Sequence, residues 1–213
     1  MRAAFVGADS PSRRKLKLLL YGHGFAVRFL AALSLQKNGS RTSRISERVT
    51  DMTVRAYNIS DIPRMAQIWN EVVEQGEAFP QTEKLSEEAA REFFAAQSHC
   101  GVCEDDGGLV GLYILHPNNV GRCGHIANAS YAVRTDMRGR HIGELLVSDC
   151  IKMCGELGFG ILQFNAVVST NTPALRLYKK LGFTQLGIIP HGFRRDDGTY
   201  ADIIPHYIEI IKR

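Results

Sequence analysis

Residues 133–146, VRTDMRGRHIGELL, decide the fold. The end of an apolar run passes through a basic turn that contains Gly139 and enters a stretch with apolar residues at helical spacing. The pattern therefore predicts a strand, a tight turn and a helix. Successive backbone N–H groups at such a turn point toward one place, and the dipole of the following helix adds positive potential there. The stretch predicts an anion site suited to a pyrophosphate.

A second informative stretch, residues 171–183, reads NTPALRLYKKLGF. Its apolar spacing predicts a helix from about Thr172 to Leu181, which Gly182 ends. One glycine-bearing turn alone would be weak evidence for a phosphate-bearing ligand. Two motifs in this order along one chain are much more specific.

Both stretches resemble signatures of the GNAT superfamily of acyl-CoA-dependent N-acetyltransferases. Residues 138–143 are similar to its pyrophosphate-binding fingerprint, which has a basic residue or Gln, two residues, Gly, one residue, and Gly or Ala. Residues 171–183 are similar to its second signature. The resemblance departs at His141, which stands at the first glycine of the fingerprint. A helix-like backbone there needs no positive φ, so we expect its N–H to remain a donor.

The resemblance implies acetyl-CoA as the cofactor, with its pyrophosphate on the turn and its pantetheine arm between the strands 125–133 and 161–168. Val133 would offer its backbone amide and carbonyl to that arm, and Asn171 would hydrogen-bond it. Tyr178 would lie near the thioester sulfur. The implied cofactor-binding residues are Val133, Arg138, Gly139, Arg140, His141, Ile142, Gly143, Asn171 and Tyr178.

Apolar periodicity also predicts the remaining elements. Strands are expected at 53–57, 101–104, 109–116, 125–133, 161–168, 183–190 and 203–211, and helices after Ser60 to about Gln75, at 86–97, at 142–157 and at 172–181. Residues 189–200 are expected to form a loop between the last two strands. With the resemblance, this order predicts a GNAT-like α/β (α+β) fold. Its mixed, mostly antiparallel sheet would have six to seven strands, helices on both faces and a splayed parallel pair joined by helix 142–157.

Acetyl transfer to a neutral amine needs a route for the ammonium proton, a donor for the oxyanion and an acid for the leaving thiolate. Tyr178 is the candidate acid, and the alternative is a tyrosine of the core. Strand 125–133 carries no carboxylate, so the base would be His125, a water relay or a residue from elsewhere. An exposed histidine at a strand edge is the simpler interpretation of His125.

Asn128 and Asn165 occupy the two strands expected to line the cleft. Asparagine is disfavoured inside strands, and a buried amide needs hydrogen-bond partners, so the pair indicates a polar ligand. The alternative is that each satisfies a bulge or a loop. The surrounding strings are similar to those of fungal acetyltransferases that act on proline-like amino acids. By that likeness, Asn128 and Asn165 would hold the substrate carboxylate and assist catalysis.

Charge is distributed unevenly along the chain. Residues 1–51 carry 10 Lys or Arg against 3 Asp or Glu, whereas residues 52–213 carry 16 against 19. The first segment therefore reads as a basic leader, expected to be unordered, that is a transit peptide or an over-long start before Met52. Its apolar stretch is interrupted, which argues against a membrane span. The slightly acidic remainder argues against nucleic-acid binding, and Arg194 and Arg195 are read as a solvated cluster, with pairing to an acidic substrate or to cofactor phosphate as the alternative.

Five cysteines, an odd number, indicate a reducing compartment and no disulfide framework. Cys100 and Cys103 have the spacing of a metal or redox pair, but in a strand they would point to opposite faces, so no metal is expected. Cys150 and Cys154 are read as small core residues. Because no cysteine falls in the cleft-lining strings, direct attack in a ternary complex is favoured over an acyl-cysteine.

We therefore expect an acetyltransferase domain at 52–213 that acetylates the amine of a small molecule, an amino acid or analogue. The alternatives are an enzyme that acetylates a protein N-terminus or lysine, and a non-catalytic acyl-CoA-binding module. A cytoplasmic enzyme is expected, or a mitochondrial one if 1–51 is a transit peptide. No membrane or nucleic-acid partner is expected, and the sequence leaves open whether the protein forms a homodimer.

Overall fold

The computed structural model describes residues 52–106 and 108–210, so the predicted leader lies outside the described residues. Eight strands form one sheet in the order β1-β2-β3-β4-β5-β8-β6, with β7 paired to β8. The strands are β1 (Thr53–Ala56), β2 (His99–Asp105), β3 (Gly108–Pro117), β4 (Ile126–Val133), β5 (Ile161–Val168), β6 (Thr184–Gln185), β7 (Ile189–Arg194) and β8 (Tyr200–Glu209). The helices are α1 (Ile62–Gln75), α2 (Glu87–Ala95), α3 (Ile142–Glu156) and α4 (Thr172–Lys180).

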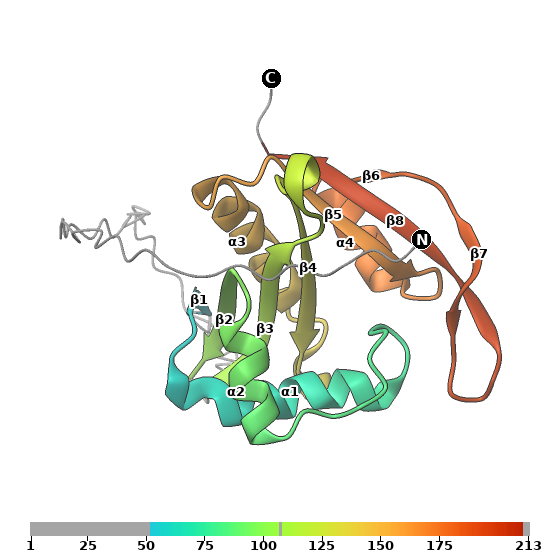
Figure 1. Cartoon of the computed structure of the whole chain (residues 1–213). Coiled ribbons are helices and arrows are strands. Elements are labelled where there is room, and N and C mark those ends of the chain that lie inside the picture. Colours follow the sequence, from blue (N-terminus) through green and yellow to red (C-terminus); the bar gives the residue numbers. More distant parts are fainter. Residues whose placement is uncertain (1–51, 107, 211–213) are drawn as a thin grey trace, which may run out of the picture. The chain divides into compact units, whose positions relative to one another are not determined.

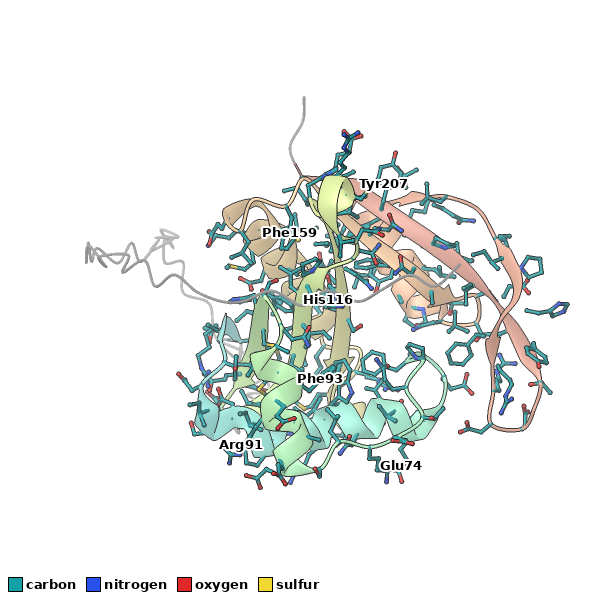
Figure 2. All side chains as sticks on the ribbon, in the orientation of Figure 1. Glu74, Arg91, Phe93, His116, Phe159 and Tyr207 are labelled. Atoms are coloured by element: carbon teal, nitrogen blue, oxygen red, sulfur yellow. The ribbon has the colours of Figure 1, made fainter. Side chains whose placement is uncertain are left out.

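The helices cover both faces of the sheet (Figure 1). On one face, α1 and α2 bury Trp69 and Phe94 against β2 and β3. On the other, α3 and α4 form a core with β3, β4 and β5. The charged residues Glu74 and Arg91 lie on the outer side of α1 and α2 (Figure 2). The predicted fold class is confirmed.

Strand β2 shows how the two cores are separated. Cys100 belongs to the core under α1 and α2, and Cys103 belongs to the core under α3. Both thiols are buried and free, as are Cys150 and Cys154. Burial raises the pKa of Cys100 to about 12 and that of Cys103 to about 11. Cys100 and Cys103 therefore lie on opposite faces of the sheet, as alternation along a strand requires.

Local signals explain where the helices begin and end. The Ser86 hydroxyl accepts a hydrogen bond from the Ala89 N–H and caps α2. Pro63 lies in the first turn of α1, and Gly76 ends that helix with a left-handed φ of 61°. The Asn171 side chain accepts from the Ala174 N–H at 3.3 Å and caps α4.

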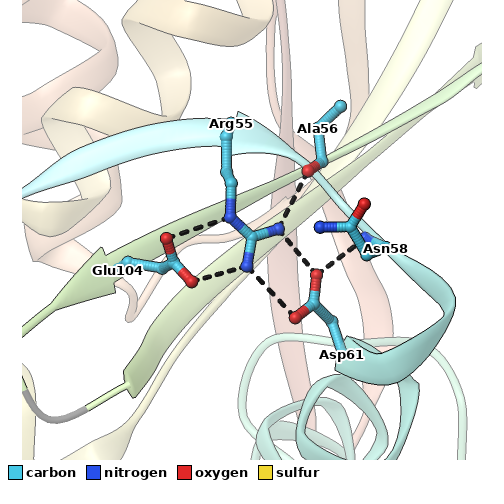
Figure 3. Close-up of polar contacts among 5 residues, drawn as sticks. All are labelled: Arg55, Ala56, Asn58, Asp61 and Glu104. Atoms are coloured by element: carbon cyan, nitrogen blue, oxygen red, sulfur yellow. Dashed lines mark hydrogen bonds and ion pairs between the residues drawn. The ribbon is translucent and has the colours of Figure 1, made fainter.

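An ion cluster fixes the first strand to the sheet. The Arg55 guanidinium binds Asp61 at 2.7 Å and Glu104 at 2.5 Å, which connects β1 to the start of α1 and to β2 (Figure 3). Its hydrogen bonds lower the pKa of both carboxyls below their ordinary values. A carboxyl with a lowered folded-state pKa stabilises the fold above its unfolded pKa, and this stabilisation is lost as the pH falls through the folded value.

The parallel strands β4 and β5 pair only at Ile126 with Ile161 and at Ala127 with Leu162. Helix α3 is the crossover between them, as predicted. Farther along β5, the pairing with β8 shifts register between Phe164 and Val167. Strands β4 and β5 therefore separate after a contact of two residue pairs, and the predicted splayed pair is confirmed.

The C-terminal region differs from the prediction. The expected strand 183–190 is divided into β6 and β7, because Gly187 has a φ of 153° between them. The expected loop 189–200 contains β7, which pairs with β8 through Ile189 and Ile203 and again through Phe193 and Ala201. Pro190 lacks a backbone donor but is tolerated because β7 is an edge strand. The sheet therefore has eight strands instead of six to seven.

Among the described residues, no helix is both long enough and apolar enough to cross a bilayer.

Gly101 generates a stability prediction, because a Cβ at this position would overlap the ring of Tyr113. Tyr113 is fully buried and its hydroxyl donates to Asp149 at 2.6 Å, so the ring is held in place. We expect Gly101→Ala to lower the free energy of unfolding by about 1–3 kcal/mol, as measured by urea denaturation. Gly160→Ala is the control, because its Cβ would meet His125 at an ordinary 3.5 Å. Equal stability of the two variants would contradict this packing.

Candidate active site

A cavity of about 800 Å³ lies where β4 and β5 separate. Residues at the end of α1, among them Val72 and Gln75, line it from one side of the sheet. The start of α3 and the side of α4 line it from the other. The cavity therefore connects the two faces of the sheet through the opening between the strands.

Most of the predicted cofactor-binding residues meet in this cavity. Those that line it are Val133, Arg138, Gly139, His141, Ile142, Gly143, Asn171 and Tyr178. Arg140 does not. Its guanidinium binds Asp105 at 3.0 Å, at the turn between β2 and β3. Arg140 was expected beside the phosphates because it lies within the fingerprint. Its ion pair with Asp105, which is distant in sequence, instead directs its side chain away from the cavity.

The turn before α3 offers unused backbone donors. Within residues 52–106 and 108–210, the N–H groups of His141, Ile142 and Gly143 donate to no acceptor. The first amides of a helix have no partner inside the helix, and the helix dipole places positive potential there. The turn therefore fits a phosphate group.

The backbone at His141 contradicts the helix-like conformation expected from the sequence. Its φ is 62° and its ψ is 11°, in the left-handed region, and Gly139 also has a positive φ of 81°. A non-glycine residue in this region costs on the order of 1 kcal/mol, although histidine adopts it more readily than most residues. The turn thus keeps the shape that a glycine would favour at this position.

Most of the charged side chains around the turn have polar partners within the protein. Arg138 donates to Gln75 at 2.5 Å. Glu144 binds Lys180 at 2.6 Å and His141 at 3.4 Å, and the hydrogen bond from Lys180 lowers the pKa of Glu144. The exposed Arg176 of α4 also lines the cavity and makes no ion pair within the described residues. Nothing in the sequence pattern indicated Arg176 as a site residue.

Tyr178 lies in the core and also lines the cavity. Its ring packs 4.6 Å from Phe164 and 5.4 Å from Phe183, between ring centroids. Burial, and to a lesser extent the nearby Cys150, raise the pKa of its hydroxyl, which therefore stays protonated at neutral pH. The hydroxyl makes no hydrogen bond to any described residue. Tyr178 is therefore both a tyrosine of the core and a residue that lines the cavity, so its position agrees with each of the two interpretations.

Tyr131 is a second cavity-lining tyrosine, and the sequence analysis did not identify it. It shares one face of β4 with Val133, and its ring contacts Phe164 at 5.7 Å between centroids. Its buried hydroxyl lies beside the Cys150 thiol and makes no well-formed hydrogen bond to any described residue. Burial raises the pKa of this hydroxyl well above its ordinary value. Alternation along β4 was the signal that could have placed it beside Val133.

Asn128 and Asn165 do not line the cavity. Asn128 lies between Ala127 and Ala129, which pack in the core under α3 and α4, so its side chain points to the opposite face. Its Oδ1 accepts from the Ala129 N–H at 2.8 Å. Asn165 falls at the register shift of β5, and its side chain bonds to Gln163 and Asn118. The structure therefore places both asparagines away from the residues expected to hold the cofactor.

The other candidate groups have ordinary surroundings. His125 is exposed and does not line the cavity. Arg194 is also exposed, whereas Arg195 approaches Glu77 at 3.9 Å and Thr170 at 3.4 Å, at the rim of the cavity. Among the described residues that line the cavity, the carboxylates are Glu77 and Glu144. No group of three or more potential metal ligands occurs among the described residues.

Comparisons with known proteins agree with this geometry. The sequence pattern described as "Acetyltransferase (GNAT) family" matches residues 63–183. N-acetyltransferase aca1 of Schizosaccharomyces pombe is 29% identical over 137 residues, which cover 56% of this chain and 66% of that protein, slightly less than two thirds of its length.

Two solved structures illustrate the similarity in fold. A GCN5-related N-acetyltransferase from Kribbella flavida superposes with a TM-score of 0.69 and 33% identity, covering 74% of this chain and 97% of that one. A phosphinothricin acetyltransferase from Sinorhizobium meliloti, solved in complex with acetyl-CoA, has a TM-score of 0.69 and 20% identity, covering 74% of this chain and 88% of that one. Acetyl-CoA is the acetyl donor of this family, and the unused amides beside the cavity fit its pyrophosphate.

His141 tests whether the backbone of the turn, and not the imidazole, holds the cofactor. We expect His141→Gly to keep the Kd for CoA within about threefold, because glycine adopts the same φ without strain. We expect His141→Val to weaken binding by at least about tenfold, because a β-branched residue resists a positive φ. Isothermal titration with CoA measures both values. A strong loss in His141→Gly would instead assign the binding to the imidazole.

Proposed function

Because the chain belongs to the acetyltransferase (GNAT) family, we propose that it transfers the acetyl group of acetyl-CoA to the amine of a small molecule, an amino acid or a close analogue. The observation that carries the proposal is the cavity beside the splayed strands, which has unused backbone amides on the side of α3 and is lined by the end of α1 on the other side of the sheet. A donor and an acceptor can therefore approach each other from opposite faces.

On the donor side, acetyl-CoA would supply the acetyl group as an activated thioester. The N–H groups of His141, Ile142 and Gly143 would hold its pyrophosphate. The backbone of Val133 and the Asn171 side chain would hold its pantetheine arm. Because Asn171 Oδ1 already caps α4, its Nδ2 group is the atom left to donate.

Tyr178 would serve as the acid. Its raised pKa keeps the proton on the hydroxyl, so the residue is in the form that a departing thiolate requires. Direct attack by the acceptor amine is supported by the cysteines, because none of the five lines the cavity. No acyl-enzyme is therefore needed.

On the acceptor side, Asn128 and Asn165 would orient the substrate and assist catalysis. Both side chains lie on the face opposite to the core formed by α3 and α4. An amino acid as acceptor is supported by their amide groups, which suit a carboxylate. It is also supported by the structural relative that acetylates phosphinothricin.

We propose, in addition, that residues 52–213 are the catalytic domain and act in the cytoplasm. The first described strand begins at Thr53, and the family pattern lies inside this range. Four buried free thiols suit a reducing compartment. We expect a protein that begins at Met52 to keep full activity and to gain melting temperature with acetyl-CoA.

The test of the proposed function is an acetyl-transfer screen over amino acids, cyclic imino acids, polyamines and peptides. The release of free thiol from acetyl-CoA measures the rate with each acceptor. We expect the highest kcat/KM among amino or imino acids. A preference for peptides would instead indicate a protein acetyltransferase, and CoA binding without any transfer would indicate a non-catalytic module.

Tyr178→Phe tests the assignment of the acid. We expect kcat to fall by about 10²–10⁴-fold, the usual contribution of general acid–base catalysis, with the Kd for CoA little changed. Because burial raises the pKa of Tyr178, the wild-type rate should show no alkaline decline caused by this group below about pH 10, the ordinary tyrosine value. A loss of less than about tenfold in kcat would remove Tyr178 from the mechanism.

Asn128→Ala and Asn165→Ala test the acceptor site. We expect each to lower kcat/KM for amino-acid acceptors by about 10-fold or more, because a hydrogen bond to a charged group is worth about 1.5–3 kcal/mol. The KM for acetyl-CoA should not change, because neither residue lines the cavity. Unchanged kcat/KM for every amino acid in both variants would refute the substrate-binding role.

A further inference from the structure

Three side-chain amides form a connected group, the amide network, made of Asn118, Gln163 and Asn165. Asn118 and Asn165 bond reciprocally. The Nδ2 of Asn165 donates to Asn118 Oδ1 at 2.7 Å, and the Nδ2 of Asn118 donates to Asn165 Oδ1 at 3.1 Å. Gln163 Nε2 also donates to Asn165 Oδ1, at 2.9 Å. Asn165 therefore makes three hydrogen bonds within the protein.

These bonds decide which atoms of Asn165 remain for a ligand. A side-chain carbonyl oxygen has two lone pairs, and an amide nitrogen has two N–H donors. Both lone pairs of Asn165 Oδ1 are used by Asn118 and Gln163, and one of its two N–H donors is used by Asn118. Asn165 can still donate one hydrogen bond, and it has no lone pair left with which to accept one.

The backbone around the amide network holds Asn118 in place. Asn118 directly follows β3, and its backbone N–H donates to the Ile126 carbonyl at 2.8 Å. Its side chain then reaches Asn165 on β5, 47 residues later in the sequence. Asn165 itself lies at the register shift of β5, and such an irregularity can redirect a side chain next to an active site. The reciprocal bond fixes the amide plane that the register shift alone would leave free to rotate.

We propose that Asn118 is a positioning residue that fixes Asn165 as a pure hydrogen-bond donor, so that the acceptor site selects a substrate with a carboxylate oxygen at this point. This inference rests on the proposed function, which places Asn165 at the acceptor. An amide that can only donate pairs with an oxygen acceptor, most strongly with an anionic one, and cannot pair with an ammonium group or an amide N–H. Without Asn118, the Asn165 side chain can turn its oxygen toward the ligand and loses this selectivity.

The experiment compares Asn118→Ala with Asn119→Ala, the matched control. Asn119 is the next residue of the same loop, is exposed, and makes no side-chain hydrogen bond to any described residue. For each protein, kcat/KM is measured for the best amino-acid acceptor and for its carboxamide, and their ratio gives the carboxylate preference. The melting temperature and the KM for acetyl-CoA are measured alongside.

We expect Asn118→Ala to reduce the carboxylate preference by about tenfold, mainly through the KM of the amino acid, with the KM for acetyl-CoA and the melting temperature unchanged. Gln163→Met removes one bond to Asn165 and leaves the reciprocal pair, so it should reduce the carboxylate preference less. Asn119→Ala should not change the carboxylate preference.

The outcomes separate this role from the proposed function. If the wild-type enzyme prefers the carboxylate and Asn118→Ala retains that preference, the positioning role is wrong while the proposed acceptor stands. If the wild-type enzyme shows no preference for the carboxylate, both are wrong.

Discussion

The whole site depends on the short contact between the parallel strands β4 and β5, which pair at only two positions. Longer pairing would close the sheet at this point, and the cavity that passes between the strands would not exist. Helix α3 begins at Ile142, after the turn that follows β4, and residues with unused amides at its start line the cavity. The separation of the two strands thus leaves space for a ligand, and the start of α3 places positive potential beside that space.

The opening divides the chemistry between two faces of one sheet. On the face of α3 and α4, aromatic rings form a continuous wall in which Phe164 contacts both Tyr131 and Tyr178. Such packing keeps water away and holds the Tyr178 hydroxyl in its protonated form. On the other face, β4 and β5 carry the amide side chains of Asn128 and Asn165. Under the proposed function, the apolar wall would lie beside the thioester, and the amides would lie beside the acceptor.

Periodicity predicted most of the fold, because burial on one face of a helix or strand repeats along the sequence. The bounds of β5 and the start of α3 at Ile142 are examples. The left-handed backbone of His141 could not be predicted, because the path of the turn imposes it. The ion pair of Arg140 with Asp105 and the bond of Asn118 to Asn165 join residues distant in sequence, and only the assembled sheet brings them together. Local pattern therefore located a turn that lines the cavity, while tertiary contacts decided which side chains face that cavity.

The most direct measurement of the central claim is the initial-velocity pattern of thiol release when acetyl-CoA and an amino-acid acceptor are varied together. A donor in the cavity and an acceptor that approaches it from the opposite face of the sheet predict a ternary complex and double-reciprocal lines that intersect. Parallel lines, with acetyl-enzyme trapped in the absence of acceptor, would contradict the account, because they would require a covalent step that the cavity-lining residues do not provide.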